Sequence, residues 1–313
     1  MPSLLAIVVL TVTLNAAIDR TVTLARLDQD PDREALDDRF QAGGKGLNVA
    51  RVLRVLGQPA RAVVVVGGRA GRWLRDDLAR GDIPFEAVEA QGETRTCLEI
   101  VERGSGRIRQ VHGPGVEAGG DVVTQLLETV DAALPGARWL AVCGRLARGM
   151  PAGTVAQLVL LARSRGVPCA VDTSDAALLP AWRAGPALLR VNRAEAEGAL
   201  GRPLAIDRPL PDPPGRTDLT VISDGPHPVL AWRDGGPAWR IAPPRIDLRN
   251  PIGCGDAMLA GLLAADLDGA GDEAALRRAT ALAAADAESP VAGCPDPARA
   301  RTLAPAVAIR TLT

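Results

Sequence analysis

Short apolar runs alternate along the chain with segments whose apolar residues recur at helical spacing. The apolar runs of strand length occupy residues 4–12, 61–68, 137–144, 167–174, 187–192 and 219–225, and the helix-period segments occupy residues 47–57, 154–166 and 256–267. Strands that alternate with helices in this way are typical of βαβ units. The pattern therefore predicts an α/β fold with a mostly parallel sheet that helices cover on both faces.

Two regions depart from this rhythm because polar and apolar residues alternate within them. They lie at roughly residues 21–40 and 94–111, and the second contains a Gly-Ser-Gly turn. Such alternation is typical of exposed antiparallel strands, which could form a small β-strand lid or a plain edge hairpin. A proline-rich stretch at residues 201–218 cannot hold a long helix, and we interpret it as an irregular crossover. We expect residues 1–313 to form a single α/β domain with two lid segments.

The composition is that of an ordinary globular protein. With 47% hydrophobic residues, 23% charged residues and a formal net charge of −1, it gives no basis for binding nucleic acid or an anionic membrane. The five cysteines include no Cys-x-x-Cys pair, so neither a disulfide framework nor a zinc site is indicated, and a cytoplasmic location is expected. The apolar run near the first residue is too short to span a bilayer.

The stretch "NPIGCGDAML" places a glycine loop directly before a helix-period segment. Gly253 and Gly255 flank Cys254, so backbone N–H groups would stand unobstructed at the positive end of a helix dipole. Such a cradle suits a phosphate that carries developing negative charge. Asp256 would follow in the first helical turn, either as a cap or as a general base for an attacking hydroxyl. The spacing alone favours the cap, because a lone Gly-x-Gly-Asp is a weak signal.

Several stretches together resemble the ribokinase-like carbohydrate kinases of the PfkB family. "NPIGCGDAML" is similar to the family's Gly-Ala-Gly-Asp signature, and "AGGKGLNVARVL" is similar to its Gly-Gly loop before a helix. "TLNAAIDRT" resembles a motif of the hexose-phosphate branch, and weaker matches follow in the family's order: "GETRTCLEI", "VDTSDAALL", "RVNRAEAE" and "VISDGP". The matches cover nearly the whole chain and fit best the branch with 1-phosphofructokinase, tagatose-6-phosphate kinase and the minor 6-phosphofructokinase. The resemblance implies a ribokinase-like fold with a β-strand lid.

The resemblance also implies roles for the C-terminal loop. Asp256 matches the catalytic base of the family, and the N–H groups of Gly253, Cys254 and Gly255 match its anion hole. Phosphoryl transfer needs an in-line hydroxyl, a proton acceptor and donors for the phosphate oxygens. The loop and its aspartate would supply the last two.

On the sugar side, the resemblance implies that Asp19 binds hydroxyl groups and that Gly43, Gly44 and Asn48 form the substrate loop. Ordinary turn chemistry would explain the same aspartate and glycines. Lys45 is the only lysine among 36 lysine and arginine residues. Because a compact ammonium is not interchangeable with a planar guanidinium, we expect Lys45 to lie close to substrate or phosphate.

A phosphorylated sugar requires a second anion site, away from the transferred phosphoryl group. Arg95 matches a lid arginine of the family that meets the substrate's own phosphate. Arg33 and Arg109 are further candidates, because arginine offers bidentate contacts to phosphate. Each of the three could equally be a solvated charge.

On the nucleotide side, the resemblance places Asn192 and Glu195 near Mg²⁺-bound ATP, and Ser223 and Gly225 beside the nucleotide. ATP and Mg²⁺ are thus the implied cofactors. We expect the phosphates of ATP and water to hold the Mg²⁺, so no residue is assigned as a metal ligand. Alternatively, these four residues have only a structural role where strands end and loops begin.

The chain departs from the family pattern at several positions. Ala16 replaces a proline, and Arg190 and Val191 stand where Lys and Pro are usual. Pro228 replaces a glycine near the nucleotide, and Arg145 replaces a small hydroxyl residue near the substrate. These changes bear on substrate identity and nucleotide affinity, whereas the catalytic loop is intact.

Taken together, the resemblance implies an ATP-dependent kinase of a phosphorylated ketohexose, with fructose 1-phosphate as the favoured substrate. Tagatose 6-phosphate or fructose 6-phosphate is the alternative, followed by an unphosphorylated sugar or a nucleoside. A sugar- or nucleotide-binding regulator without turnover is an alternative of a different class. Exposed strand edges often find partners, so a homodimer through the lid strands is also expected.

Overall fold

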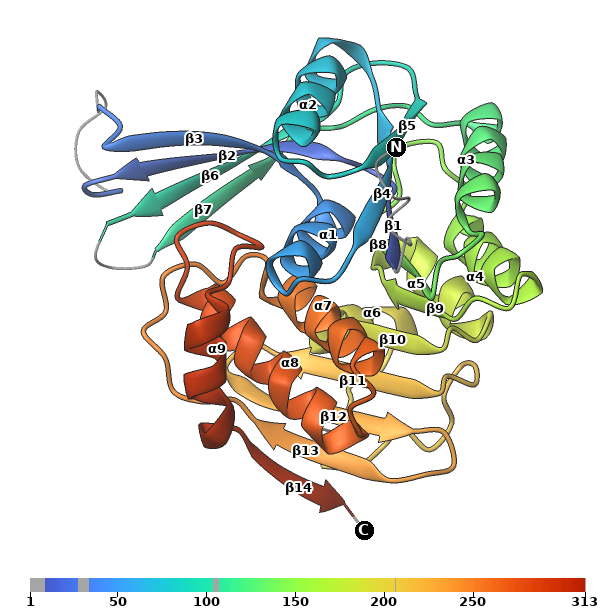
Figure 1. The fold of residues 1–313 in the computed structure, drawn as a ribbon, viewed down its shortest axis with the longest axis vertical. Helices are drawn as coiled ribbons and strands as arrows, with labels where there is room; N and C mark the ends of the chain where they lie inside the picture. Colours follow the sequence, from blue (N-terminus) through green and yellow to red (C-terminus); the bar gives the residue numbers. More distant parts are fainter. Residues whose placement is uncertain (1–8, 28–33, 104–106, 206, 313) are drawn as a thin grey trace.

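The computed structural model of the protein describes residues 9–27, 34–103, 107–205 and 207–312. Its main element is a ten-stranded sheet with the order β14-β13-β12-β11-β10-β9-β8-β1-β4-β5 (Figure 1). These strands are β1 (Val9–Thr13), β4 (Ala60–Val66), β5 (Phe85–Glu89), β8 (Trp139–Cys143), β9 (Cys169–Asp172), β10 (Leu188–Asn192), β11 (Leu219–Asp224), β12 (His227–Arg233), β13 (Ala238–Ala242) and β14 (Ala308–Leu312). All neighbours from β5 to β11 pair in parallel, whereas β12, β13 and β14 pair antiparallel at one edge.

The expected parallel sheet is confirmed. Each of the six apolar runs supplies a parallel strand, and the central strand β1 places Val9 beside Ala60 on one side and Trp139 on the other. The antiparallel edge was not predicted. Its strands β11, β12 and β13 are joined by tight turns at residues 225–226 and 234–237, so no helix-period segment separates them in the sequence.

Helices cover both faces of the sheet (Figure 1). They are α1 (Lys45–Val55), α2 (Gly68–Arg80), α3 (Gly120–Ala133), α4 (Thr154–Ser164), α5 (Leu178–Arg183), α6 (Arg193–Leu200), α7 (Cys254–Leu267), α8 (Asp272–Ala287) and α9 (Pro297–Leu303), with short 3₁₀ turns η1 (Asp175–Ala177) and η2 (Ala304–Ala306). Alternate residues of a strand point to opposite faces. Along β4, Val64 accordingly belongs to the core shared with α1, α7 and α8, and Val63 to the core shared with α3 and α4.

A second, four-stranded sheet has the order β3-β2-β6-β7 and projects from the body beside α1 and α2 (Figure 1). Its strands are β2 (Ala17–Leu24), β3 (Asp37–Gly43), β6 (Arg95–Glu102) and β7 (Ile108–His112). The two alternating sequence regions therefore form strands of one small sheet. The outer pairs are antiparallel as expected, but the central β2–β6 pair is parallel. It joins two segments far apart in the chain, and nothing in either segment alone specifies that pairing.

The parallel strands end at one common edge of the main sheet, and the chain there enters the small sheet or a helix. β1 leads into β2, β10 leads directly into α6, and β9 ends at Asp172. Open α/β sheets bind ligands at this carboxyl edge. None of the helices in the described part of the chain combines the length and the apolar composition that crossing a bilayer requires. Within residues 201–218, the part that the structure describes forms neither helix nor strand.

Candidate active site

The loop before α7 is shaped by Gly253. This residue has φ of 89°, a conformation that is accessible to glycine at little cost. A Cβ at this position would lie 2.6 Å from the Gly293 backbone nitrogen and 2.8 Å from Asp286 Oδ2. Only a residue without a side chain fits between these groups, so the tight entry into α7 depends on glycine.

The amides at the start of α7 have no oxygen acceptor among the described residues. No oxygen atom of the described residues accepts a hydrogen bond from the N–H groups of Gly253, Cys254 or Gly255, and the first helical bond runs from Ala257 N to Gly253 O. Helix N-termini with free N–H groups bind anions. These three amides can therefore receive the oxygens of a phosphate.

Asp256 follows these amides and is buried, with 5% of its surface exposed. Its Oδ2 accepts a hydrogen bond of 2.8 Å from Asn48 Nδ2, which comes from α1. Burial, together with the nearby Asp172 carboxylate, raises the pKa of Asp256 to about 7, although Lys45, Asn48 and Arg190 act in the opposite direction. A carboxyl group with a pKa near neutrality is suited to take up a proton during a reaction.

Lys45 begins α1 and reaches two carboxylates. Its Nζ lies 2.6 Å from Asp172 Oδ1 and 3.4 Å from Glu195 Oε1. Burial lowers the pKa of Lys45, but the negative charges of Asp172, Glu195 and Asp256 outweigh this effect and raise it above its ordinary value. The ammonium group therefore remains charged at the centre of the carboxyl edge of the sheet.

A second cation, Arg190, lies beneath the glycine loop. Its Nη1 donates to Asp172 Oδ2 at 2.7 Å and its Nη2 donates to Ser223 Oγ at 2.6 Å. A Cβ on Gly255 would lie 2.1 Å from Arg190 Nη1, so the guanidinium packs directly against this glycine. Arg190 thus places a fixed positive charge next to the free amides.

The sequence did not single out Asp172, which links both cations. It lies at the end of β9 with no exposed surface, and the attraction of Lys45 and Arg190 outweighs burial and holds its pKa below its ordinary value. Its stretch "VDTSDAALL" matched the family without a residue assignment, and Arg190 stood out only as a replaced lysine. The available signal was a charged residue at the carboxyl end of a buried strand.

The residues that are expected to bind the sugar lie close together where the small sheet meets α1. A Cβ on Gly43 would lie 2.0 Å from Asp19 Oδ2, and the Gly44 N–H and the Cys97 thiol both act to lower the pKa of the Asp19 carboxyl. Burial raises the pKa of Asp19 to about 6 against the opposing effect of Arg51 and Arg95. Gly43, Gly44 and Asp19 therefore lie together at the start of α1, the helix from which Asn48 reaches Asp256.

The candidate arginines are placed differently from one another. Arg95 lies at the base of the small sheet, where its Nη2 donates to the Asn15 carbonyl oxygen at 3.2 Å. Arg109 lies on β7 three residues before His112, so the two side chains point to opposite faces of the small sheet. His112 Nδ1 contacts Cys97 Sγ at 3.4 Å, so His112 lies on the face of the small sheet that carries Asp19. Arg109 therefore points to the other face. Arg33 lies outside the described residues.

The residues that are expected to bind the nucleotide lie close together at the ends of β10 and β11. Asn192 caps α6 through a hydrogen bond of 2.8 Å from Glu195 N, and Glu195 Oε2 accepts from Asn192 N at 2.9 Å. This reciprocal capping box explains the spacing of the two residues on structural grounds. Glu195 also faces Lys45, and Ser223 holds Arg190, so this cluster is continuous with the candidate site. Gly225 lies in the turn after β11 with φ of 56°.

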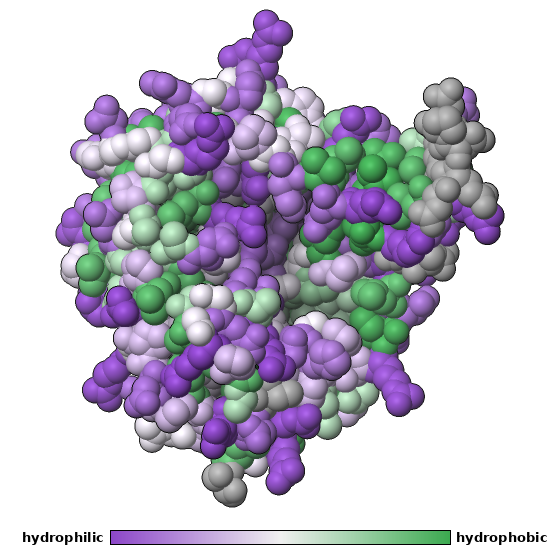
Figure 2. Space-filling view, turned by 180° about the vertical axis from the view of Figure 1, so that it is seen from behind, coloured by the Kyte–Doolittle hydropathy of each residue, from purple (hydrophilic) through white to green (hydrophobic). Residues whose placement is uncertain are grey.

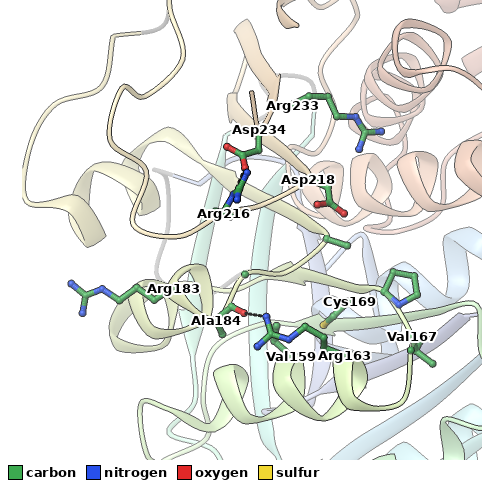
Figure 3. Close-up of a pocket in the computed structure, with 14 residues that line it drawn as sticks. Val159, Arg163, Val167, Cys169, Arg183, Ala184, Arg216, Asp218, Arg233 and Asp234 are labelled. Atoms are coloured by element: carbon green, nitrogen blue, oxygen red, sulfur yellow. Dashed lines mark hydrogen bonds and ion pairs between the residues drawn. The ribbon is translucent and has the colours of Figure 1, made fainter. Parts of the chain in front are cut away.

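A groove of about 930 Å³ lies at the opposite edge of the main sheet (Figure 3). Cys169, which begins β9, and Asp218, which precedes β11, belong to its lining, so it adjoins the amino ends of the strands. Arg216 pairs there with Asp234 at 2.8 Å. The groove contains none of the residues around Asp256 and is separate from the candidate site.

Replacing Lys45 with arginine tests the interpretation of the lone lysine. A planar guanidinium cannot reproduce the 2.6 Å contact that the compact Lys45 ammonium makes from Nζ to the buried Asp172 carboxylate. We expect kcat/KM to fall by about tenfold or more, the size of a lost charged hydrogen bond. Steady-state kinetics would measure it, with Arg54→Lys on the exposed side of the same helix as the control. Unaltered kcat and KM would show that the residue has no role near substrate.

Comparisons with known proteins agree with this geometry. The family model described as pfkB family carbohydrate kinase matches residues 11–299. The structure is similar to that of phosphofructokinase-2 from Escherichia coli in complex with potassium, with a TM-score of 0.84 and 25% identity over 96% of this chain and 98% of that chain. It also shares its fold with a possible 1-phosphofructokinase from Thermotoga maritima, with a TM-score of 0.84 and 24% identity over 98% of this chain and 100% of that chain. The chain therefore belongs to the pfkB family of carbohydrate kinases and is an ATP-dependent sugar kinase.

Proposed function

We propose that the protein transfers the γ-phosphoryl group of ATP to a hydroxyl of a phosphorylated ketohexose, with fructose 1-phosphate as substrate and fructose 1,6-bisphosphate as product. The observation that carries this proposal is the buried Asp256 carboxyl beside three amides that have no oxygen acceptor within the described residues. Membership in the family supports sugar kinase activity, and the residues of the candidate site support a phosphorylated sugar as the substrate.

In the proposed reaction, the substrate hydroxyl oxygen attacks the γ-phosphorus while its proton passes to a carboxylate oxygen of Asp256. The bond from the γ-phosphorus to the bridging oxygen breaks, and ADP leaves with the electron pair. The N–H groups of Gly253, Cys254 and Gly255 would bind the γ-phosphate oxygens, and Arg190 would add positive charge behind them. Asn48 orients the Asp256 carboxyl through its 2.8 Å hydrogen bond.

ATP would lie along the ends of β10 and β11, next to Asn192, Glu195, Ser223 and Gly225. When bound, Mg²⁺ neutralises phosphate charge; it prefers phosphate oxygens and water with one or two carboxylates. Glu195 fits such a contact through water, because it keeps 18% side-chain exposure and its one ion pair within the described residues, with Lys45, is long at 3.4 Å. No group of three or more His, Cys, Asp or Glu side chains in the part of the chain that the structure describes could hold a metal by itself.

The sugar phosphate would lie between the small sheet and α1, with Asp19, Gly43, Gly44, Lys45 and Asn48 around the sugar. Arg95 would meet the substrate's own phosphate. Arg33, which lies outside the described residues, stays a candidate from the resemblance alone. Residues 1–313 would act as one unit in which the small sheet serves as the lid.

Fructose 6-phosphate is the second candidate substrate. Phosphofructokinase-2 from Escherichia coli, 25% identical over 96% of this chain, has been solved in complex with fructose-6-phosphate. The same cradle and base would serve a hydroxyl at either end of the sugar. The position of the substrate phosphate relative to Arg95 would then decide between the two sugars.

A substrate panel tests the proposal. Purified protein with ATP and Mg²⁺ would be assayed against fructose 1-phosphate, fructose 6-phosphate, tagatose 6-phosphate, fructose and ribose. We expect the highest kcat/KM with fructose 1-phosphate. Turnover only with fructose or ribose would refute a phosphorylated substrate, and binding without any turnover would refute kinase activity of this chain.

The dependence of activity on pH follows from the environment of Asp256. A base must be ionised to accept a proton, and the pKa of this carboxyl is raised to about 7, so the active form is gained as pH rises. At pH 6 only about one molecule in ten would carry the ionised base. We expect kcat at saturating substrates to increase as pH is raised through about 7. A profile that is flat from pH 5 to 8 would contradict this role.

Self-association through the small sheet is also proposed. Leu36, Phe40 and Val111 are 45%, 49% and 59% exposed, and all three belong to the small sheet or its approach. Figure 2 shows apolar residues gathered on this side of the molecule. A structure of phosphofructokinase-2 from Escherichia coli is described as a tetrameric inhibited form. Light scattering of the protein alone and with ATP would measure the oligomeric state.

A further inference from the structure

Arg145 lies at the carboxyl end of β8, next to the substrate loop. It follows Gly144, at which a Cβ would lie 3.8 Å from Lys45 Cβ. Gly144 is itself tied to the end of β9, because its N–H donates to Asp172 O at 2.8 Å and its carbonyl accepts from Thr173 Oγ1 at 2.9 Å. The backbone of Arg145 is therefore fixed against the same strand end that holds Lys45.

Asn15 connects Arg95 to the loop that carries Arg145. The carbonyl oxygen of Asn15 accepts from Arg95 Nη2 at 3.2 Å, and the Nδ2 of Asn15 donates to the carbonyl oxygen of Leu146 at 3.2 Å. Asn15 Oδ1 and Arg95 Nε are buried and have no hydrogen-bond partner among the described residues. Asn15 thus ties Arg95 to the residue that follows Arg145, and this junction retains polar atoms without a partner among the described residues.

A third basic side chain lies near both arginines. His112 ends β7 on the face of the small sheet that carries Asp19 and Cys97. Partial burial together with the positive charges of Arg95 and Arg145 lowers the pKa of His112, so both guanidinium groups act on this imidazole. The mouth of the substrate site is therefore bordered by positive charge from the small sheet and from the β8–α4 loop.

Arg145 has one counter-ion within the described part of the chain, and that pair is exposed. Its Nε lies 3.0 Å from Asp175 Oδ2, and the two side chains are 61% and 63% exposed. Ser174 Oγ also donates to Asp175 Oδ2 at 3.0 Å. Exposed ion pairs contribute little to stability, so an incoming phosphate can compete with Asp175 for the guanidinium.

We propose that Arg145, whose loop is connected to Arg95 through Asn15, binds the phosphate that the sugar substrate already carries and so selects phosphorylated over unphosphorylated sugars. This inference rests on the proposed function, because it concerns the substrate class of the same site. Two guanidinium groups near the same imidazole offer more hydrogen-bond donors to a phosphate than either could alone. In the absence of a phosphate, the Asp175 carboxylate pairs with the Arg145 guanidinium.

Calorimetric binding of three probes tests this proposal. Fructose 1-phosphate, fructose 6-phosphate and fructose would be titrated into the wild-type chain and into Arg145→Ala. We expect the Kd for the preferred sugar phosphate to rise by about tenfold or more in the variant, as for a lost charged hydrogen bond. The Kd for fructose should change by less than about twofold, since its contacts do not involve Arg145.

Two further variants separate phosphate binding from a general surface effect. Arg148→Ala removes an equally exposed arginine three residues along, which pairs with Glu117, and should leave every Kd unchanged. Asp175→Asn removes the competing carboxylate and should tighten sugar phosphate binding, an effect opposite in sign to that of Arg145→Ala. Asparagine also tolerates the left-handed conformation of this residue, with φ of 56°.

The outcomes distinguish this inference from the proposed function. If Arg145→Ala and Arg148→Ala bind every probe as the wild type does, Arg145 forms a surface ion pair only and the inference is overturned. Equal affinity of the wild-type chain for fructose and both sugar phosphates would overturn it as well. Kinase activity is judged separately by turnover in the substrate panel, so discrimination in binding without turnover would refute the proposed function and leave the inference standing.

Discussion

Asp256→Asn is expected to lower kcat by about 10²- to 10⁴-fold, the usual contribution of a general base. Asparagine keeps the size of the side chain and can still accept the hydrogen bond from Asn48 Nδ2, but it cannot take up the substrate proton. The variant should fold normally and bind ATP and sugar phosphate. Steady-state kinetics and calorimetry on the same preparation would measure both properties.

A matched control for Asp256→Asn is present on the same helix. Asp266 lies near the end of α7, where its Oδ2 accepts a hydrogen bond from Trp139 Nε1 at 2.8 Å. Asp266→Asn should leave kcat unaltered. If Asp256→Asn also retained full turnover, the carboxyl would be a helix cap and the proposed reaction would lack its base.

Asp172→Ala is expected to reduce the free energy of unfolding by about 3–5 kcal/mol, the usual cost of removing one partner from a buried ion pair. Asp172 has no exposed side-chain surface and is the shared counter-ion of Lys45 and of Arg190, whose own side chain is only 8% exposed. Its removal would leave the buried Arg190 guanidinium with the Ser223 hydroxyl as its one hydrogen-bond partner among the described residues. Chemical denaturation would measure the change.

A double-mutant cycle would show whether this loss comes from the pair. Adding Arg190→Met to Asp172→Ala removes the uncompensated charge, so the double variant should be more stable than the two single effects predict. Asp131→Ala provides the exposed comparison, because Asp131 and Arg165 form a pair of 2.6 Å at the surface. A loss for Asp172→Ala as small as that for Asp131→Ala would show that the network does not stabilise the fold.

The main sheet could be predicted from the sequence because each of its central strands is a continuous apolar run. The run at residues 61–68 is buried on both faces in β4, as its composition required. The edge strands β12 and β13 lack a helix between them, so the βαβ rhythm did not reveal them. The parallel β2–β6 pair depends on contacts between residues about 80 positions apart, such as Asp19 beside Cys97, which no local pattern encodes.

The candidate site was predicted unevenly for a similar reason. Gly253, Gly255 and Asp256 lie in one short motif, so their chemistry was visible in the sequence. Lys45 stood out by its rarity, and the structure brings it to a carboxylate from β9, 127 residues away. Asp172 resembled an ordinary strand-end residue, since only the folded chain shows that two cations meet there. Arg109 was among the candidates by residue type alone, although β-strand alternation turns it to the other face.

The lone ε-amino group of this protein offers a direct view of the site during turnover. Since no other lysine is present, isotopic labelling of that residue type would give one side-chain signal in a nuclear magnetic resonance spectrum, from an ammonium held between Asp172 and Glu195. Its ion pairs slow the exchange of its protons with solvent, which favours detection. Titration of nucleotide and sugar could then be followed, without any introduced probe, from a single resonance.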